Sequence, residues 1–168
     1  MQATIRDERP GDIEPIENVT VQAFLNAPHT DHREQHIVRA LREAGALSVS
    51  LVAETRGEVV AHVAASPVTL SDGATGWYGI GPVSVMPAHQ RTGLGSQLME
   101  AALQRLQHLG AAGAVVLGDP AYYSRFGFKP EPELVLPGVP APYFQALAWG
   151  DSLPRGEVAY HPAFNATG

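Results

Sequence analysis

The chain has 168 residues, no cysteine and a formal net charge of -6, and 45% of its residues are hydrophobic while 17% are charged. This length suits a single well-cored domain, and the composition excludes a disordered chain. Because no run of Lys or Arg is present, the acidic balance argues against a nucleic-acid partner, and the missing thiols exclude disulfides, a cysteine nucleophile and cysteine-bound metal.

No segment of the sequence predicts contact with a membrane. The N-terminus carries charges where a signal peptide needs an apolar core, and no window approaches the ~20 apolar residues of a membrane-spanning helix. We therefore expect a cytoplasmic protein with no membrane partner, either a monomer or a homodimer. The acidic balance suits a cationic substrate.

The first third of the chain predicts one short strand followed by two helices. Residues 3–8 alternate weakly, as a strand does, and apolar residues then recur at helical spacing over 12–27. A second helix is expected to begin at Asp31, whose side chain can cap it while Glu34 reaches back in a capping box. Gly45 follows the apolar stripe of this helix as a C-cap.

Three strands are predicted next. Residues 47–53 alternate as a half-buried strand does. Residues 59–70 form a long apolar run in which Pro67 predicts a bend or a bulge. A hairpin turn at 71–73 leads into a further strand over 77–85, which contains internal Gly and Pro.

The centre of the chain reads as strand, helix and strand. Residues 93–109 repeat at helical spacing, Gly110 follows as a C-cap, and 114–117 is wholly apolar, as a parallel strand covered on both faces is. A right-handed crossover would place this segment beside the strand over 77–85. The remaining predicted strands are 143–148 and 157–160.

Two glycines one residue apart open the central helix, in Gln90-Arg91-Thr92-Gly93-Leu94-Gly95. A strand that runs through a glycine-rich turn into a helix aims free N–H groups and the helix dipole at one point, which attracts phosphate. A Walker loop needs Gly-Lys-Ser/Thr, and the dinucleotide fingerprint needs a third glycine where Leu98 stands, so neither fits. The alternative is a tight strand-to-helix turn without a ligand.

Three motifs carry a resemblance to a known family. Residues 90–95 resemble the Gln/Arg-x-x-Gly-x-Gly/Ala signature of the GNAT superfamily, the Gcn5-related N-acetyltransferases. Residues 117–128 and 160–164 resemble its bacterial YhbS-like branch. The resemblance covers nearly the whole chain and implies a single-domain α/β (α+β) fold over 1–168, with a mixed central sheet of about six to seven strands, splayed between the fourth and fifth, and about four helices.

The resemblance also implies acetyl-CoA as the co-substrate, with no metal. In the family, backbone amides of the signature turn hold the pyrophosphate, and the fourth strand hydrogen-bonds the pantetheine as an added strand would. Pro82, which lacks an N–H, fits a place where the sheet opens. The cofactor-binding residues implied in this chain are Val83, Ser84, Val85, Gln90, Arg91, Thr92, Gly93, Leu94, Gly95 and Ser96.

Acetyl transfer to an amine needs a neutral amine, a stabilised oxyanion and a proton for the departing thiolate. The family uses a backbone N–H of the fourth strand for the oxyanion, here near Val83 or Val85. It places the general acid four residues before the glycine of a Gly-Phe pair, which is Tyr123 here. The structural alternative for Tyr123 is a packed aromatic, the role expected for Tyr122.

The general base is less defined. His62 titrates near neutrality and lies on a predicted strand, although a lone histidine in an apolar strand is more often a core group. Asp119 follows the strand over 114–117, although Asp before Pro is first of all a helix cap. A partly deprotonated amine with a water chain is the third possibility.

Five polar residues crowd the start of the second helix: His29, Asp31, His32, Glu34 and His36. Two histidines at i and i+4 supply half of a zinc site, but the spacing matches neither established zinc-helix motif. We therefore predict no metal. A polar rim facing the substrate and a plain solvated face remain as interpretations.

Three functions follow. The leading one is acetyl transfer from acetyl-CoA to a primary amine of a small cationic molecule, by direct attack in a ternary complex, with the Pro-rich part over 129–168 closing the acceptor side. A non-catalytic CoA or acetyl-CoA sensor is the second. Acetylation of a protein N-terminus or lysine, which needs an open groove, is the third.

Overall fold

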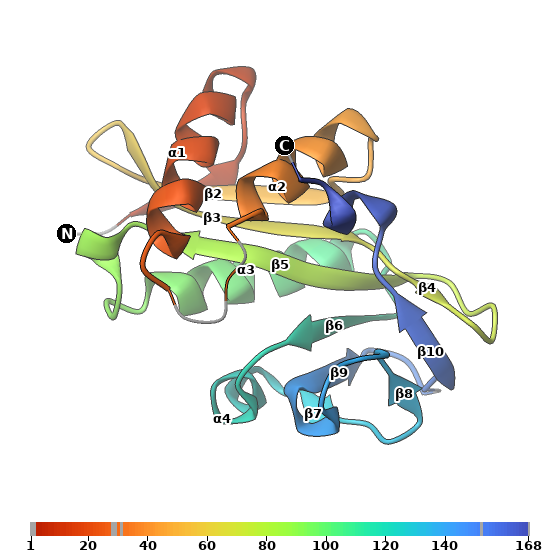
Figure 1. Ribbon diagram of the computed structural model, residues 1–168. Coiled ribbons are helices and arrows are strands. Elements are labelled where there is room, and N and C mark those ends of the chain that lie inside the picture. The colour runs from red at the N-terminus through yellow and green to blue at the C-terminus, as the bar shows by residue number, and fades with distance from the viewer. Residues whose placement is uncertain (1–2, 28–29, 31, 152, 168) are drawn as a thin grey trace.

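The computed structural model describes residues 3–27, 30, 32–151 and 153–167, and within them it contains four α-helices and ten strands (Figure 1). The helices are α1 (Ile13–Phe24), α2 (Glu34–Glu43), α3 (Leu94–His108) and α4 (Pro120–Tyr123). The strands are β1 (Thr4–Asp7), β2 (Val49–Thr55), β3 (Glu58–Pro67), β4 (Thr69–Leu70), β5 (Trp77–Val85), β6 (Gly113–Leu117), β7 (Lys129–Pro130), β8 (Leu134–Val135), β9 (Phe144–Ala148) and β10 (Gly156–Ala159). Short 3-10 helices include η2 (Pro87–His89) and η5 (Pro162–Asn165).

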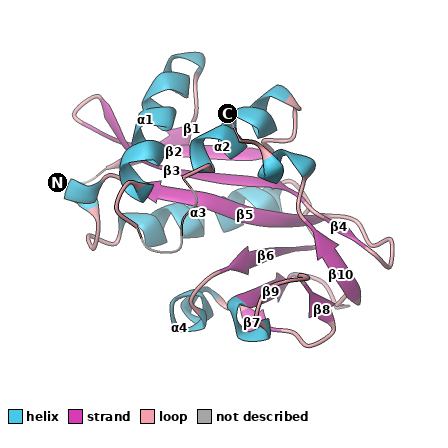
Figure 2. Ribbon diagram, in the orientation of Figure 1, coloured by secondary structure: helices cyan, strands magenta, loops and turns pink. Residues whose placement is uncertain are grey.

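Seven strands form one mixed sheet in the order β1-β2-β3-β5-β6-β9-β7, which confirms the predicted fold class. Within it β5 and β6 run parallel and the other neighbours run antiparallel. Helices α1 and α2 cover one face and α3 the other (Figures 1 and 2). A second, three-stranded sheet in the order β4-β10-β8 was not predicted.

The sheet opens between β5 and β6, which correspond to the family's fourth and fifth strands, as the resemblance implied. The two strands pair only over Trp77–Gly79 and Gly113–Val115, near the start of β5, and then diverge (Figure 1). The opposite edge of β5 stays paired with β3 as far as Val85. Beyond Gly79, the edge of β5 that faces β6 therefore lies outside the β5–β6 ladder. This unpaired edge can pair with an extended ligand.

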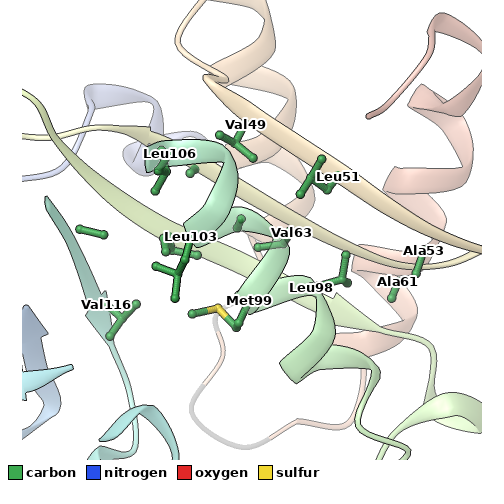
Figure 3. Close-up of a cluster of buried hydrophobic side chains, with 14 of the residues drawn as sticks. Val49, Leu51, Ala53, Ala61, Val63, Leu98, Met99, Leu103, Leu106 and Val116 are labelled. Carbon is green, nitrogen blue, oxygen red and sulfur yellow. The ribbon is translucent and has the colours of Figure 1, made fainter. Parts of the chain in front are cut away.

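The main core lies between the sheet and α3. Leu98, Met99 and Leu106 of α3 are at most 1% exposed and pack on β2 and β3 (Figure 3). The prediction of a half-buried strand over 47–53 is wrong, because Val49–Ala53 of β2 is buried throughout. Val52 faces the other way and packs under α1 and α2, so helices cover this strand on both sides.

Helix boundaries shift by a few residues from the predicted ones. Helix α1 ends at Phe24 rather than at residue 27. Helix α2 begins at Glu34, and the predicted cap, Asp31, lies outside the described residues. The Glu34 carboxylate accepts a hydrogen bond from the Thr30 hydroxyl at 2.6 Å. Gly45 has a φ of 69° and follows α2 in the left-handed conformation, as a C-cap glycine does.

The C-terminal part divides into two regions. Residues 130–142 lie by β7 and β8, and Leu134, Leu136 and Val139 pack with Trp77 away from α2. Ala163 and Phe164 of η5 instead pack against α2. The contact with the helix layer therefore comes from the end of the described chain and not from its Pro-rich stretch.

Candidate active site

The glycine turn joins the end of β5 to the start of α3. Arg91 and Gly93 take left-handed conformations, with φ of 65° and 84°. Gly93 is the N-cap and has no side chain that could cap the helix, so the first N–H groups of α3 remain available to an external acceptor. The Gln90 side chain donates to the carbonyl of Val85 at 3.0 Å and ties the turn to the strand.

The second glycine, Gly95, is not required by the fold itself. A Cβ at this position would lie 3.7 Å from the Val85 side chain and 3.8 Å from the Tyr122 hydroxyl, which are ordinary contacts. Gly95 also lies in the first turn of α3, where alanine is the better helix former. A glycine that neither packing nor backbone conformation demands is consistent with close approach of a ligand.

The turn borders a hollow of about 350 Å³ that contains most of the predicted cofactor residues. Its lining residues are Val85, His89, Gln90, Arg91, Gly93, Gly95, Ser96, Tyr122 and Arg125. Sequence reasoning missed His89 and Arg125 and assigned Tyr122 to packing alone. The Tyr122 hydroxyl lies 3.0 Å from the Ser96 hydroxyl, and the Arg125 guanidinium carbon lies 4.9 Å from the centre of the Tyr122 ring.

Four of the predicted cofactor residues turn their side chains elsewhere. Leu94 is buried in the main core, and Val83 packs against the same cluster. Ser84 is buried, and the Thr92 hydroxyl donates to the carbonyl of His89. At these positions the backbone, and not the side chain, is what the structure leaves for a ligand.

Tyr123 is the last residue of α4, and its ring lies against Gly118, the residue that follows β6. A Cβ at Gly118 would lie 2.6 Å from its ring, so the ring covers the backbone of that glycine. The ring also meets Tyr122 and Phe128 edge to face, with centroids 5.0 and 6.1 Å apart. Burial, and next the neighbouring Tyr122, raise the pKa of the Tyr123 phenol. The phenol therefore keeps its proton over the physiological pH range.

The two candidate bases occupy different environments. Asp119 is exposed and caps α4, accepting a hydrogen bond from the Ala121 N–H at 2.9 Å, which is the cap role that the sequence predicted. His62 is fully buried on β3, opposite Ser84 of β5. His62 therefore occupies the core position that the sequence had left as its structural interpretation.

A chain of polar groups connects His62 to the surface. Arg42 donates two hydrogen bonds to the Glu8 carboxylate, at 3.0 and 2.7 Å. Ser50 donates to the same carboxylate and lies 2.7 Å from His62 Nε2. Since the Ser50 proton points at Glu8, we assign the imidazole proton to Nε2. Nδ1 then carries a lone pair, and it has no partner among the described residues.

Burial lowers the pKa of His62 to about 4. The negative charge of Glu8 partly opposes this shift, and the positive charge of Arg42 adds a smaller lowering effect. The unfolded chain therefore takes up a proton at higher pH than the folded protein does. We expect the free energy of unfolding to fall by on the order of 3 kcal/mol between pH 6.5 and 4 from this group alone. Urea denaturation of the wild type and His62→Gln across this range measures it. The pH dependence should be shallower in the variant and unchanged in His108→Gln, an exposed control; equal slopes would contradict the assignment.

The polar cluster at the start of α2 is only partly described. His29 and Asp31 lie outside the described residues. Elsewhere in the described chain, no group of three His, Asp or Glu side chains gathers as a metal site would.

Within the same residues, no helix has the length and apolar character needed to cross a bilayer.

The parallel strands β5 and β6 splay apart, the glycine turn and the start of α3 follow β5, and Tyr123 follows β6, which is the arrangement that the resemblance to N-acetyltransferases implied. The model of the acetyltransferase (GNAT) family matches residues 14–128, and the chain therefore belongs to this family. This confirms the family and the enzyme class predicted from the sequence.

Two named relatives resemble the chain over nearly its full length. It is 35% identical to the uncharacterized N-acetyltransferase YhbS of Escherichia coli (strain K12) over 158 residues, covering 90% of this chain and 95% of the relative. A GNAT acetyltransferase from Brucella melitensis, in complex with acetyl-CoA, is 48% identical with a TM-score of 0.86, covering 96% of this chain and 97% of the other. The structure of E. coli YhbS in complex with CoA gives a TM-score of 0.89, covering 100% and 94%.

Proposed function

We propose that this protein transfers an acetyl group from acetyl-CoA to the primary amine of a small cationic molecule, by direct attack in a ternary complex. The observation that carries the proposal is the hollow at the glycine turn, which adjoins the opening between β5 and β6. The similar proteins from B. melitensis and E. coli were solved with acetyl-CoA and with CoA, respectively.

The residues at the turn fit a diphosphate. Free N–H groups and the positive end of α3 point at the hollow, where Gly93 and Gly95 leave room for phosphate oxygens. Arg91 and Arg125 line the same hollow and add positive charge. The unpaired edge of β5 beyond Gly79 would take the pantetheine as an added strand.

The chemistry then needs little from side chains. The amine nitrogen forms a bond to the thioester carbon, the carbon–sulfur bond breaks, the sulfur leaves with a proton and the nitrogen loses one. A backbone N–H near Val83 or Val85 would stabilise the oxyanion, and Tyr123 would protonate the thiolate. Because the chain has no cysteine, an acetyl-cysteine intermediate cannot form, which supports direct attack by the amine.

The proton of the amine has two candidate acceptors in the chain. The Asp119 carboxylate is exposed but engaged as a cap, whereas His62 Nδ1 has a free lone pair but is buried. We favour loss of the proton to water from an amine that arrives partly deprotonated.

The packing of Ala163 and Phe164 on α2 supports closure of the acceptor side by the C-terminal part.

A free-thiol release assay tests the function. We expect wild-type protein with acetyl-CoA to release thiol with at least one small cationic amine, because the acidic balance favours cations. We expect no release with peptides, because they need an open groove and the C-terminal part is proposed to close the acceptor side. Peptides that carry a free N-terminus or lysine are part of the panel, and their preferential turnover would contradict the substrate class. Silence with every acceptor, together with measurable binding of acetyl-CoA, would contradict catalysis and favour a CoA sensor.

A further inference from the structure

Tyr160 is the first residue of the motif over 160–164. It lies at the vertex of the sheet opening, the point at Gly79 where β5 stops pairing with β6. It directly follows β10, and its ring covers the backbone of Gly79, where a Cβ would lie 3.3 Å from the ring carbon that bears the hydroxyl. Gly79 is the last residue of β5 that pairs with β6. The Tyr160 ring therefore ends where the two strands begin to separate.

The Tyr160 hydroxyl is buried and has no hydrogen-bond partner in the described part of the chain. Burial, and next the nearby Tyr123, raise the pKa of its phenol, so it stays neutral. The influence of Tyr123 on this pKa means that the two phenols lie within electrostatic reach of each other. A buried hydroxyl that no protein group satisfies is uncommon and calls for a ligand or a water.

A second buried hydroxyl lies on the same face of the sheet, across from Gly79. Ser66 of β3 is directly opposite Gly79 of β5, so its side chain points to the same face of the sheet as the missing Cβ of Gly79, the face that Tyr160 covers. The Ser66 hydroxyl is buried and also lacks a partner among the described residues. Two hydroxyls without a partner among the described residues thus lie on one face of the sheet, one on Ser66 opposite Gly79 and one on the ring that covers Gly79.

The position of Tyr160 does not depend on its hydroxyl. Its ring meets Phe164 edge to face, with centroids 4.9 Å apart. His161 Nδ1 accepts a hydrogen bond from the Ala163 N–H at 3.0 Å. Arg33, at the start of α2, donates to the carbonyls of Phe164 and Ala166 at 3.1 and 3.0 Å. These contacts hold the segment on α2 and leave the hydroxyl free for another partner.

We propose that the Tyr160 hydroxyl, together with that of Ser66, hydrogen-bonds the acceptor amine and orients it toward the thioester. The inference rests on the proposed function. A neutral phenol accepts a hydrogen bond from an amine N–H and leaves the nitrogen lone pair free for attack. Because it does not ionise, it forms no ion pair that would hold the acceptor as an ammonium group.

Tyr160→Phe tests the proposal, with Tyr143→Phe, at an exposed tyrosine of the C-terminal part, as the matched control. We expect kcat/KM for the amine to fall at least about tenfold in Tyr160→Phe and Ser66→Ala, while the Kd of acetyl-CoA in isothermal titration stays within about twofold. The melting temperature of Tyr160→Phe should stay equal or rise, because removing an unpaired buried hydroxyl removes a cost. A lower melting temperature with unchanged kcat/KM would assign the hydroxyl to the fold and overturn the proposal.

Failure of the proposed function is distinguishable from failure of this inference. If the wild type turns over an amine and Tyr160→Phe retains that turnover, only the role of Tyr160 is overturned. If the wild type turns over no amine, the thermal shift that each amine produces on the CoA-saturated protein is compared instead. A shift that the wild type shows and Tyr160→Phe loses supports an acceptor-binding role; equal shifts, or none in the wild type, overturn it.

Discussion

Replacing Gly95 with alanine is expected to weaken acetyl-CoA binding at least about tenfold while stabilising the folded protein. The added methyl group makes only ordinary contacts with Val85 and Tyr122, so the fold accepts it. Alanine in the first turn of α3 should add about 0.5–1 kcal/mol to the free energy of unfolding. The same methyl would occupy space that the diphosphate needs. Isothermal titration and urea denaturation measure the two effects.

The opposite signs of these two effects make the test specific to the ligand. Gly11→Ala is the matched control, because a Cβ there meets nothing within 4 Å and the backbone is not in the left-handed region. It should leave the Kd unchanged. Gly93→Ala is less informative, since its φ of 84° strains any other residue. If Gly95→Ala bound acetyl-CoA as tightly as the wild type, the diphosphate would have to lie elsewhere.

Tyr123→Phe is expected to lower kcat for thiol release by roughly 10²–10⁴-fold, the range of general acid catalysis, without changing the Kd of acetyl-CoA. The ring stays in place on Gly118, since phenylalanine keeps the same contacts and loses only the hydroxyl. Stopped thiol release with intact affinity separates an enzyme from a sensor, which has no use for the phenol. Tyr143→Phe, at an exposed site, should behave as the wild type.

The pH profile gives a second, independent measure of Tyr123. Because burial raises the pKa of this phenol, the active, protonated form persists through neutral pH and is lost only as the pH rises through the raised value. Wild-type kcat should therefore fall only on the alkaline side, above the pH at which an exposed tyrosine ionises. The residual rate of Tyr123→Phe should lack this fall. An alkaline limb that persists in the variant would belong to another group.

Local sequence pattern predicted most of the helices and strands and the glycine turn, because these depend on neighbouring residues, whereas the splayed mixed sheet was implied by the family resemblance. The apolar stripe of α3 indicates which side of that helix packs on the sheet, and the apolar run of β6 indicates that both faces of that strand are covered. Two parallel strands need a crossover connection, which α3 supplies. The glycine pair marked the turn because glycine lacks a Cβ, whatever lies around it. The local pattern could not say that β2 is covered on both faces, because that depends on where α1 and α2 pack.

The side chains around the site were decided by contacts between distant parts of the chain. Tyr122 and Arg125 reach the turn only because α4 and the residues after it pack beside the start of α3. His62 became a core group through Ser50, and Tyr160 came to the vertex by packing on Gly79. Helical and strand periodicity therefore determined the elements and the place of the glycine turn. Only the tertiary structure decided which polar groups surround that turn and which remain unpaired, because packing between segments far apart in the chain leaves no local signature in the sequence.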